Sequence, residues 1–501
     1  MESKFKELKN TLRTIYDLDM ARSLLEWDQA TYMPAGGAAA RGRQIALLMR
    51  LRQEHLSSAE LGRLLDALES HSESMDPDAD DVRLIQVSRQ EFERATKVPP
   101  DFIARISEHR AKSYQVWVEA RPKNDFATTL PLLEKTLDLS REYSNYFPGY
   151  EHIADPLIDL ADPGMKAYEL HTLFNELRTE LVPLVAAILS KEVIEDGPVR
   201  KQFAEEPQLE FGVKIISDFG FDFTRGRQDK TDHPFMTKCS LDDVRITTRV
   251  TVDNLMDALF STLHEAGHGM YELGINPQFE GTPLANGASA GVHESQSRLW
   301  ENIVGRSRSF WEHYYPKLQS TFPEQLQNVT CGEFYNAVNK VSRSLIRADA
   351  DEVTYNLHVM IRFDLEMQLL EGTLAVKDLP AAWHARYESD LGLRALDDRD
   401  GVLQDVHWFG FLIGGAFQGY TLGNIMSSLF YDAALQAHPE ITDEIAHGKF
   451  ELLHTWLRKN IYHQGKKFTS NELVKRVTGE SLTIDPYIQY LKSKYGELYN
   501  L

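Results

Sequence analysis

Helical periodicity of the hydrophobic residues dominates this chain from end to end. Apolar side chains recur every three or four positions over most of its length, which is the spacing of an amphipathic helix. Turn-forming residues interrupt the pattern at the acidic stretch 71–81, at 121–125 and in the ADPGM segment near residue 164. We find no internal repeat and no Gly-, Ser- or Pro-rich linker. The sequence therefore predicts a mainly α-helical protein in which residues 1–501 form a single domain.

One segment alternates like a β-strand instead. The two alternating sets in DDVRITTRVT are Val244, Ile246, Thr248 and Val250 on one face and Arg245, Thr247 and Arg249 on the other. The FMTKCS segment just upstream and a bend at residues 241–243 predict that this strand belongs to a hairpin. We therefore expect a small β-sheet with a polar, arginine-bearing face.

A helix is predicted directly after this hairpin. Leu255, Leu259 and Leu263 repeat every four residues and predict a buried stripe. Asp253 is the expected N-cap, and Gly274 is the expected C-terminal end.

The same helix contains the sequence HEAGH at residues 264–268. His264 and His268 are four residues apart, so their imidazoles lie on one face of the helix. Glu265 lies one step around the helix, within reach of a water molecule held by a metal ion. This H-E-x-x-H arrangement is typical of zinc peptidases, in which the histidines bind the metal and the glutamate is the general base.

A catalytic zinc site needs a third protein ligand and an open fourth position. Glu294 lies 26 residues after His268, beyond a Gly-, Ala- and Ser-rich loop and near the start of an amphipathic helix. His293 and Glu301 are alternative ligands in the same segment. A set of two histidines and one glutamate favours Glu294.

Six motifs in order make the chain resemble the M32 family of metallocarboxypeptidases, the carboxypeptidase Taq type. They are HPF at 233–235, DVRIT at 243–247, HEAGH at 264–268, HESQ at 293–296, IRADAD at 346–351 and GVLQDVHW at 401–408. The N-terminal WDQATYMPAGGAAARGRQ and the C-terminal TGESLTIDPYIQYLKSKYGELY are also similar to the family.

The resemblance implies a helical, zincin-type peptidase with a deep substrate groove, related to the neurolysin and angiotensin-converting-enzyme peptidases. It also implies zinc-dependent removal of carboxy-terminal residues by a homodimer. The sequence departs from the family at 414–419, where GGAFQG replaces most of a Phe-Gly-Tyr-Phe-Pro-x-Tyr stretch. The final tyrosine of that stretch is retained as Tyr420. We therefore leave open the shape of the groove wall at this segment and, with it, the preference for the substrate's side chains.

A carboxypeptidase also needs a cation for the free carboxylate of its substrate. Arg347 is the first candidate because the family motif places it near the site, and Arg245 and Arg249 are the alternatives. Asp351 could accept a ring N–H from a metal-bound histidine.

Catalysis further needs donors for the oxyanion of the tetrahedral intermediate. His407 and Tyr420 are our candidates for that role. Zinc is the expected metal, with Co²⁺ or another divalent ion as the alternative.

Composition and charge limit the partners and the cellular location that we expect for this protein. The formal net charge of −21 and the pI near 5.3 argue against nucleic acid or an anionic membrane as a partner. Cys239 and Cys331 are the only cysteines, so a disulfide framework is not expected and a reducing compartment is favoured. The start of the chain does not resemble a signal peptide, and no apolar run reaches the length of a membrane span. We expect a cytoplasmic enzyme.

Three other functions remain open at this stage. H-E-x-x-H alone is equally compatible with a zinc oligopeptidase or with an enzyme that releases dipeptides. A non-catalytic helical protein that binds peptides is a further alternative. The intact Glu265 and Glu294 argue against it. Our principal hypothesis is a zinc carboxypeptidase of broad specificity that acts on peptides with a free C-terminus.

Overall fold

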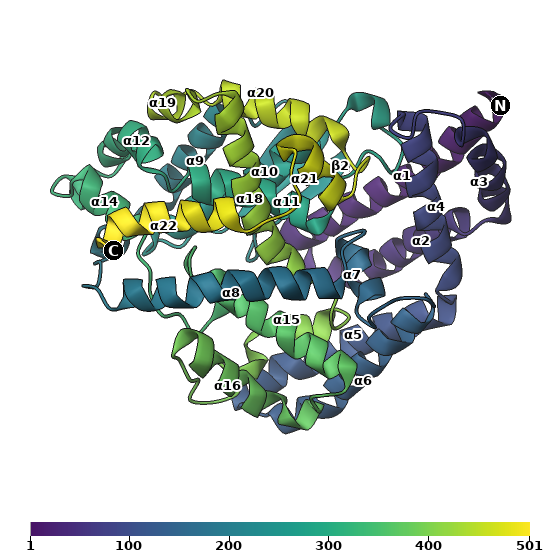
Figure 1. Cartoon of the computed structure of the whole chain (residues 1–501), viewed down its shortest axis with the longest axis horizontal. Helices are drawn as coiled ribbons and strands as arrows, with labels where there is room; N and C mark the ends of the chain where they lie inside the picture. The colour runs from purple at the N-terminus through teal and green to yellow at the C-terminus, as the bar shows by residue number, and fades with distance from the viewer. Residues whose placement is uncertain (1) are drawn as a thin grey trace.

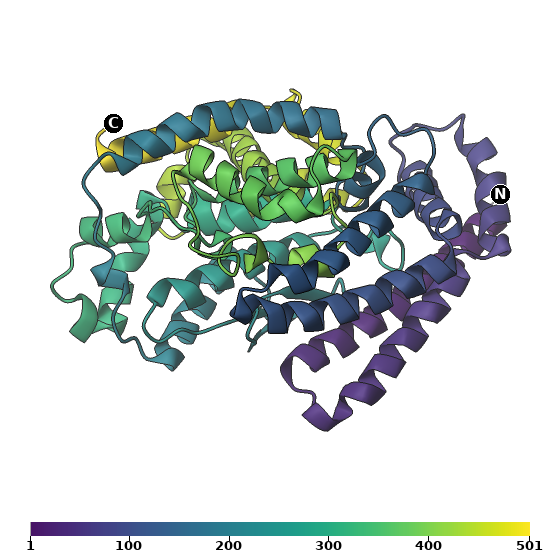
Figure 2. The same cartoon turned by 90° about the horizontal axis from the view of Figure 1, so that it is seen from below.

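The computed structural model of the protein describes residues 2–501 and is mostly helical. The first six long helices are α1 (Glu2–Thr31), α2 (Ala38–Leu56), α3 (Ala59–Ser72), α4 (Asp80–Lys97), α5 (Pro100–Ala120) and α6 (Phe126–Asn145). Helices α1 and α2 form a hairpin that stands out from one end of the molecule (Figure 2). The predicted breaks at 71–81 and 121–125 separate α3 from α4 and α5 from α6.

The remaining chain builds the body of the molecule. Its helices are α7 (Asp155–Ala161), α8 (Ala167–Leu189), α9 (Glu205–Phe219), α10 (Leu255–Leu273), α11 (Ala290–Arg298), α12 (Arg308–Thr321), α13 (Pro323–Leu326), α14 (Cys331–Val338), α15 (Tyr355–Glu371), α16 (Leu379–Leu391), α17 (His407–Gly410), α18 (Gln418–Ala437), α19 (Ile441–Ala446), α20 (Glu451–Asn460), α21 (Ser470–Thr478) and α22 (Asp485–Tyr499). A π-helical turn, η5 (Leu299–Val304), continues α11 directly. The third predicted break, ADPGM, separates α7 from α8.

Helices α10, α11 and α18 lie together in the middle of the molecule, with α22 beside α8 along one side (Figure 1). The largest cluster of buried apolar residues extends from Val98 to Tyr499 and surrounds these central helices. A second cluster joins the N-terminal helices to Leu241 and to the loop after α10. None of the helices within residues 2–501 combines the length and the apolar character needed to span a bilayer.

Helix α10 follows the predicted pattern with one correction at its start. Leu255, Leu259 and Leu263 are each at most 3% exposed, so the buried stripe is confirmed. Gly274 ends the helix as predicted. The N-cap is Asn254 and not Asp253, because the side chain of Asn254 accepts a hydrogen bond from the backbone N–H of Met256.

The predicted hairpin is present within a three-stranded sheet of order β1-β3-β2. Strand β2 (Met236–Ser240) pairs antiparallel with β3 (Asp243–Thr248), whereas β1 (Gly226–Lys230) pairs parallel with β3. The sequence analysis missed β1, whose residues GRQDK lack apolar alternation. Val244 and Ile246 are fully buried, and the sheet packs on α10.

The predicted polar face of β3 is only partly confirmed. Thr247 is fully buried and exchanges hydrogen bonds with the backbone of Phe235, so it does not belong to an exposed face. Strand β3 ends at Thr248, which leaves Arg249 beyond it. Arg245 packs on the ring of Trp27 in α1, 4.3 Å from the ring centroid.

Glycines let the three central helices approach each other closely. A Cβ at Gly267 in α10 would lie 2.6 Å from the backbone oxygen of Gln296 in α11. A Cβ at Gly423 in α18 would collide with the side chain and backbone of Glu294. These contacts leave no room for a methyl group. The first sets the distance between α10, which carries the two motif histidines, and α11, which carries Glu294, and the second sets the distance between α18 and α11.

We predict that Gly267→Ala destabilises the metal-free protein, although alanine favours helices more than glycine does. Overpacking against backbone costs about 1–3 kcal/mol, whereas the gain in helix propensity is about 1 kcal/mol. Thermal unfolding followed by circular dichroism should therefore show a lower midpoint.

Gly42→Ala in α2 is the matched control, since nothing lies within 4 Å of a Cβ at that position. It should leave the midpoint unchanged or raise it. An unfolding midpoint of Gly267→Ala at or above that of the wild type would contradict the role of Gly267 in close packing.

Candidate metal centre

Three metal-binding side chains converge where α10 meets α11. The Nε2 atoms of His264 and His268 lie 3.7 and 3.4 Å from Oε2 of Glu294. The potential ligand atoms of all three residues lie within 4.8 Å of one another. Two ligands of a tetrahedral zinc ion with bonds near 2.0–2.1 Å are themselves about 3.3 Å apart. The residues therefore fit a divalent metal.

The two carboxylate oxygens of Glu294 have different partners. Oε2 faces the histidines, whereas Oε1 accepts a hydrogen bond of 2.7 Å from Nε of Arg298, one helical turn later. Burial alone would raise the pKa of Glu294, but Arg298 and the two histidines lower it well below its usual range. Glu294 is therefore a buried carboxylate whose Oε2 faces the histidines and also accepts a hydrogen bond of 3.2 Å from the Ser297 hydroxyl.

Glu265 lies beside these donors on α10 and is 7% exposed. Burial, opposed by His264 and assisted by the carboxylates of Glu294 and Glu301, raises the pKa of its carboxyl group to about 7. A nearby divalent cation would lower this pKa again by Coulomb attraction. A carboxylate that titrates near neutrality beside a metal position is suited to accept and return a proton.

A carboxylate holds the far nitrogen of His264. Its Nδ1 lies 2.8 Å from Oε2 of Glu301, which in turn accepts a hydrogen bond of 3.1 Å from Arg298. Glu301 lies on the π-helical turn η5. This contact directs Nε2 of His264 toward Glu294 and places Glu301 behind the ligand cluster.

Asp351 does not have the partner that the sequence analysis suggested. Its carboxylate accepts hydrogen bonds from the backbone N–H groups of Ser342, Val353 and Thr354 and from the Thr354 hydroxyl. These hydrogen bonds of the Asp351 carboxylate thus organise the chain before α15. The contact expected of Asp351 is made by Glu301, a residue that the sequence analysis considered only as a ligand.

His268 has a different partner from His264. Its Nδ1 lies 2.6 Å from Nδ1 of His293, whose Nε2 lies 2.9 Å from Oε1 of Glu272. His293 was an alternative third ligand in the sequence analysis. The structure places its ring behind His268, and His293 does not belong to the candidate cluster of metal ligands found among residues 2–501.

A groove of about 890 Å³ opens at His264 and Glu265. Basic and acidic residues both line it. They include Arg249, Arg306, Lys340 and Arg347, with Asp196, Asp257, Asp349 and Asp351. A groove of this size and polarity can hold an extended peptide, with a peptide bond beside His264 and Glu265.

The three candidate anchors for the terminal carboxylate are not equivalent. Arg347 and Arg249 both line the groove, whereas Arg245 packs on Trp27 and forms an ion pair with Asp243. Arg347 lies on a short 3-10 helix, η6 (Arg347–Asp349), and makes two hydrogen bonds to Asp405. Arg249 is paired in the same way with Asp257.

His407 and Tyr420 cluster around Arg347. Nδ1 of His407 lies 2.9 Å from the same Asp405 oxygen that binds Arg347. The ring centroid of Tyr420 lies 5.6 Å from the Arg347 guanidinium. Among residues 2–501, the groove lining includes Arg347 and Tyr355 but neither His407 nor Tyr420.

The sequence analysis missed Tyr355, the first residue of α15. Its hydroxyl accepts a hydrogen bond of 3.2 Å from Arg347, and Arg298 lies 4.7 Å above its ring. It therefore lies between the carboxylate-bound Arg298 and the candidate anchor Arg347. No spacing rule points to it, because Arg298 and Arg347 come from two other segments of the chain.

Internal hydrogen bonds hold the atypical segment 414–419. The backbone N–H of Gly414 donates to the buried carboxylate of Glu366, and the Gln418 amide donates to the fully buried Asp162. Asp162 also accepts a hydrogen bond from the backbone of Gly291 in the first turn of α11. The segment is thus linked to the helix that carries Glu294.

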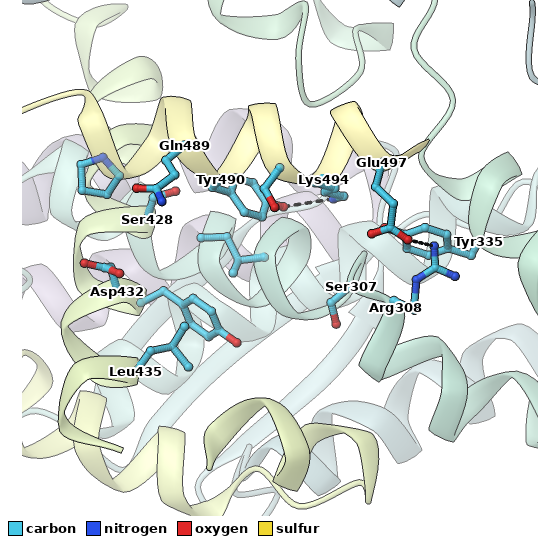
Figure 3. Close-up of a pocket in the computed structure, with 14 residues that line it drawn as sticks. Ser307, Arg308, Tyr335, Ser428, Asp432, Leu435, Gln489, Tyr490, Lys494 and Glu497 are labelled. Atoms are coloured by element: carbon cyan, nitrogen blue, oxygen red, sulfur yellow. Dashed lines mark hydrogen bonds and ion pairs between the residues drawn. The ribbon is translucent and has the colours of Figure 1, made fainter. Parts of the chain in front are cut away.

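A second cavity of about 410 Å³ is lined mainly by residues of α18 and α22 (Figure 3). Its two basic groups are already paired, Arg308 with Glu497 and Lys494 with Glu352. None of the residues predicted for the site is in the lining that the described part of the chain gives this cavity. The groove beside α10 is therefore the candidate functional site.

Comparison with known proteins supports the same conclusion. A sequence profile of the carboxypeptidase Taq (M32) metallopeptidases matches residues 7–495. Thermostable carboxypeptidase 1 of Thermus thermophilus is 38% identical over 508 aligned positions, which cover 99% of both chains. Carboxypeptidase 1 of Bacillus subtilis is 34% identical, again over 99% of both chains.

Solved structures agree with these sequence matches. An M32 carboxypeptidase from Deinococcus radiodurans is 52% identical, covers 100% of both chains and superposes with a TM-score of 0.97. A Pyrococcus furiosus carboxypeptidase is 34% identical over 98% of this chain and 99% of the other, with a TM-score of 0.95. The resemblance noted in the sequence is confirmed, and the oligopeptidase and non-catalytic alternatives are not favoured. The chain belongs to the carboxypeptidase Taq (M32) metallopeptidase family and is a metal-dependent carboxypeptidase.

Proposed function

We propose that His264, His268 and Glu294 hold a zinc ion and that the enzyme removes single residues from the C-terminus of peptides. The observation that carries this proposal is the convergence of three metal-binding donors beside the buried Glu265 at a polar groove. Two histidines and one glutamate form the ligand set of many zinc peptidases. Co²⁺ or another divalent ion is the alternative metal.

A divalent metal bound there would supply a Lewis acid for the scissile carbonyl and would make a water molecule more acidic. Glu265 accepts the proton of that water and passes it to the leaving amine. Its burial favours this role because a carboxylate with a raised pKa can both take up and release a proton near neutral pH.

Hydrogen-bond donors near Arg347 would stabilise the oxyanion. We assign this role to Tyr420 and His407, which cluster with Arg347 around Asp405. Tyr355 lines the groove itself and is a further candidate for the same role. All three carry polar hydrogens on rigid, largely buried side chains, as preorganised stabilisation requires.

Arg347 is our first candidate for binding the substrate's terminal carboxylate. Its Nε and Nη2 donate to Asp405 and its Nη1 donates to Tyr355, which fixes the guanidinium plane at the groove wall. Each Nη atom carries a second N–H that could bind a carboxylate. Arg249 is the alternative, since it lines the same groove, and Arg245 is the least favoured because it packs on Trp27.

The remaining features of the proposal depend on the family and on composition. We propose broad specificity for the terminal residue, a homodimer, a single domain over residues 1–501 and a cytoplasmic location. The net charge of −21 supports the further proposal that neither nucleic acid nor an anionic membrane is a partner.

The first test concerns the metal. Purified protein should contain about one divalent ion per chain, and a chelator should remove the ion together with the activity. His264→Ala should lose tight metal binding because it removes one of three protein ligands. His447→Ala, which changes an exposed histidine, is the control and should keep the metal. Full metal content in His264→Ala, measured by elemental analysis, would contradict the assignment.

The second test separates the base from the ligands. Glu265→Gln keeps the shape of the side chain but cannot accept the proton, so turnover should fall about a thousandfold or more while the metal stays bound. Glu294→Ala should lose metal and activity together. Steady-state kinetics and metal analysis on the same samples measure both quantities. Turnover near the wild-type value in Glu265→Gln would reject this mechanism.

The third test asks which arginine binds the terminal carboxylate. The measured quantity is the ratio of kcat/KM for a peptide acid to that for its C-terminal amide, compared within each variant. A charge-assisted hydrogen bond contributes about 1.5–3 kcal/mol, so the wild-type ratio should be about 10–100. Arg347→Ala should reduce the ratio to near 1, because the anchor is absent for both substrates.

Arg245→Ala is the matched control and should keep the wild-type ratio, since this side chain packs on Trp27. A ratio that falls in Arg249→Ala but not in Arg347→Ala would move the anchor to Arg249. Equal cleavage of acid and amide by the wild type, with internal fragments appearing first in mass spectra, would reject exopeptidase action.

A further inference from the structure

The two histidines of the metal site are held by chemically different partners. A carboxylate, Glu301, contacts Nδ1 of His264 at 2.8 Å. Another imidazole, that of His293, contacts Nδ1 of His268 at 2.6 Å. Because two lone pairs facing each other would repel, one of the two Nδ1 atoms in this second contact must carry a proton.

The position of that proton follows from the rest of the site. Nε2 of His268 faces Glu294 and must keep its lone pair to bind a metal. His268 therefore carries its proton on Nδ1 and donates it to Nδ1 of His293. His293 then carries its own proton on Nε2 and donates it to Oε1 of Glu272, 2.9 Å away. Each donor in this chain meets an acceptor.

A buried ion pair ends this chain of hydrogen bonds. Glu272 and Lys238 are 5% and 7% exposed, and their charged atoms lie 2.7 Å apart. Burial alone would raise the pKa of Glu272, but Lys238 and His293 more than offset this and lower it to about 2. Glu272 is thus an anion that accepts a hydrogen bond from Nε2 of His293.

The same ion pair connects three segments of the fold. Lys238 comes from β2, and Glu272 comes from the last turn of α10. Lys238 also donates to Oδ1 of Asn286 at 3.1 Å and to the backbone oxygen of Ala285, while Glu272 accepts from the backbone N–H of Gly287. These contacts hold the loop that leads into α11 and therefore bear on where Glu294 lies relative to His268.

We propose that Lys238, Glu272 and His293 form a positioning chain that orients His268 and sets the affinity of the site for its metal. The inference depends on the metal site of the proposed function. It assigns roles to three residues that the mechanism does not use, and it gives the small sheet a part in metal binding. Outer partners of metal-bound histidines typically contribute 10- to 100-fold to metal affinity.

The experiment compares metal affinity in variants of the full-length protein by competition with a chromophoric chelator. His293→Phe fills the space of the ring but removes the acceptor, so zinc affinity should fall 10- to 100-fold. His293→Asn places an amide oxygen close to the former Nδ1, so it should restore most of that loss. A merely structural role would not distinguish these two variants in this way.

Two further variants complete the design. Lys238→Met combined with Glu272→Gln removes both buried charges together, so neither is left unpaired, and zinc affinity should fall several-fold. His454→Phe is the matched control, because His454 packs on Tyr462 much as His293 packs on Tyr271. It should keep wild-type affinity. Circular dichroism of each metal-free variant verifies that it is folded.

The outcomes separate this inference from the proposed metal site. If the wild type binds zinc stoichiometrically and His264→Ala does not, the site is correct. His293→Phe with wild-type affinity would then overturn the positioning chain alone, and so would an equal loss in His293→Asn and His293→Phe. An unchanged zinc affinity in the Lys238 and Glu272 double variant would show that these two residues do not belong to the positioning chain. A wild type without stoichiometric zinc binding would overturn the proposed site itself.

Discussion

The burial of the Glu294 carboxylate is the constraint on which the rest of the site depends. A carboxylate with 7% exposure has lost most of its water and needs cations in its place. Arg298 binds one oxygen, and the other is left facing two imidazoles that are neutral when they bind a metal. A divalent ion at that position would complete the charge compensation, so binding of the proposed metal would also stabilise the folded site.

This constraint explains why charge pairs surround the ligands in two layers. Glu301 orients His264 and is itself neutralised by Arg298. A second cation, Arg306, lies with its Nη2 3.6 Å from Oε1 of Glu301. Glu272 acts on His268 only through His293 and is neutralised by Lys238. A buried carboxylate without such a partner would take up a proton and could no longer accept a hydrogen bond. Glu294, Glu301 and Glu272 therefore each have a basic partner.

The sequence predicted those features that depend on local spacing. Helical periodicity predicted α10 and its buried leucine stripe, and the HEAGH spacing placed His264 and His268 on one face. Glu294 was predicted from ligand chemistry and distance along the chain, and it lies beside those histidines. The hairpin was predicted by alternation, but β1 was missed because a parallel partner strand of mostly polar residues carries no such signal.

The partners of the ligands could not be predicted in this way, because they are set by packing between distant segments. Asp351 was the expected partner of a ligand histidine, yet its carboxylate binds local backbone N–H groups, and Glu301 makes that contact. Arg245 and Arg249 were expected on one face of a strand, but the strand ends between them and only Arg249 lines the groove. The sheet is small, yet it delivers Lys238 to the end of α10, 34 positions before Glu272 in the chain. A helical protein thus uses one short strand to bring a cation to the C-terminal end of the helix that carries the two motif histidines.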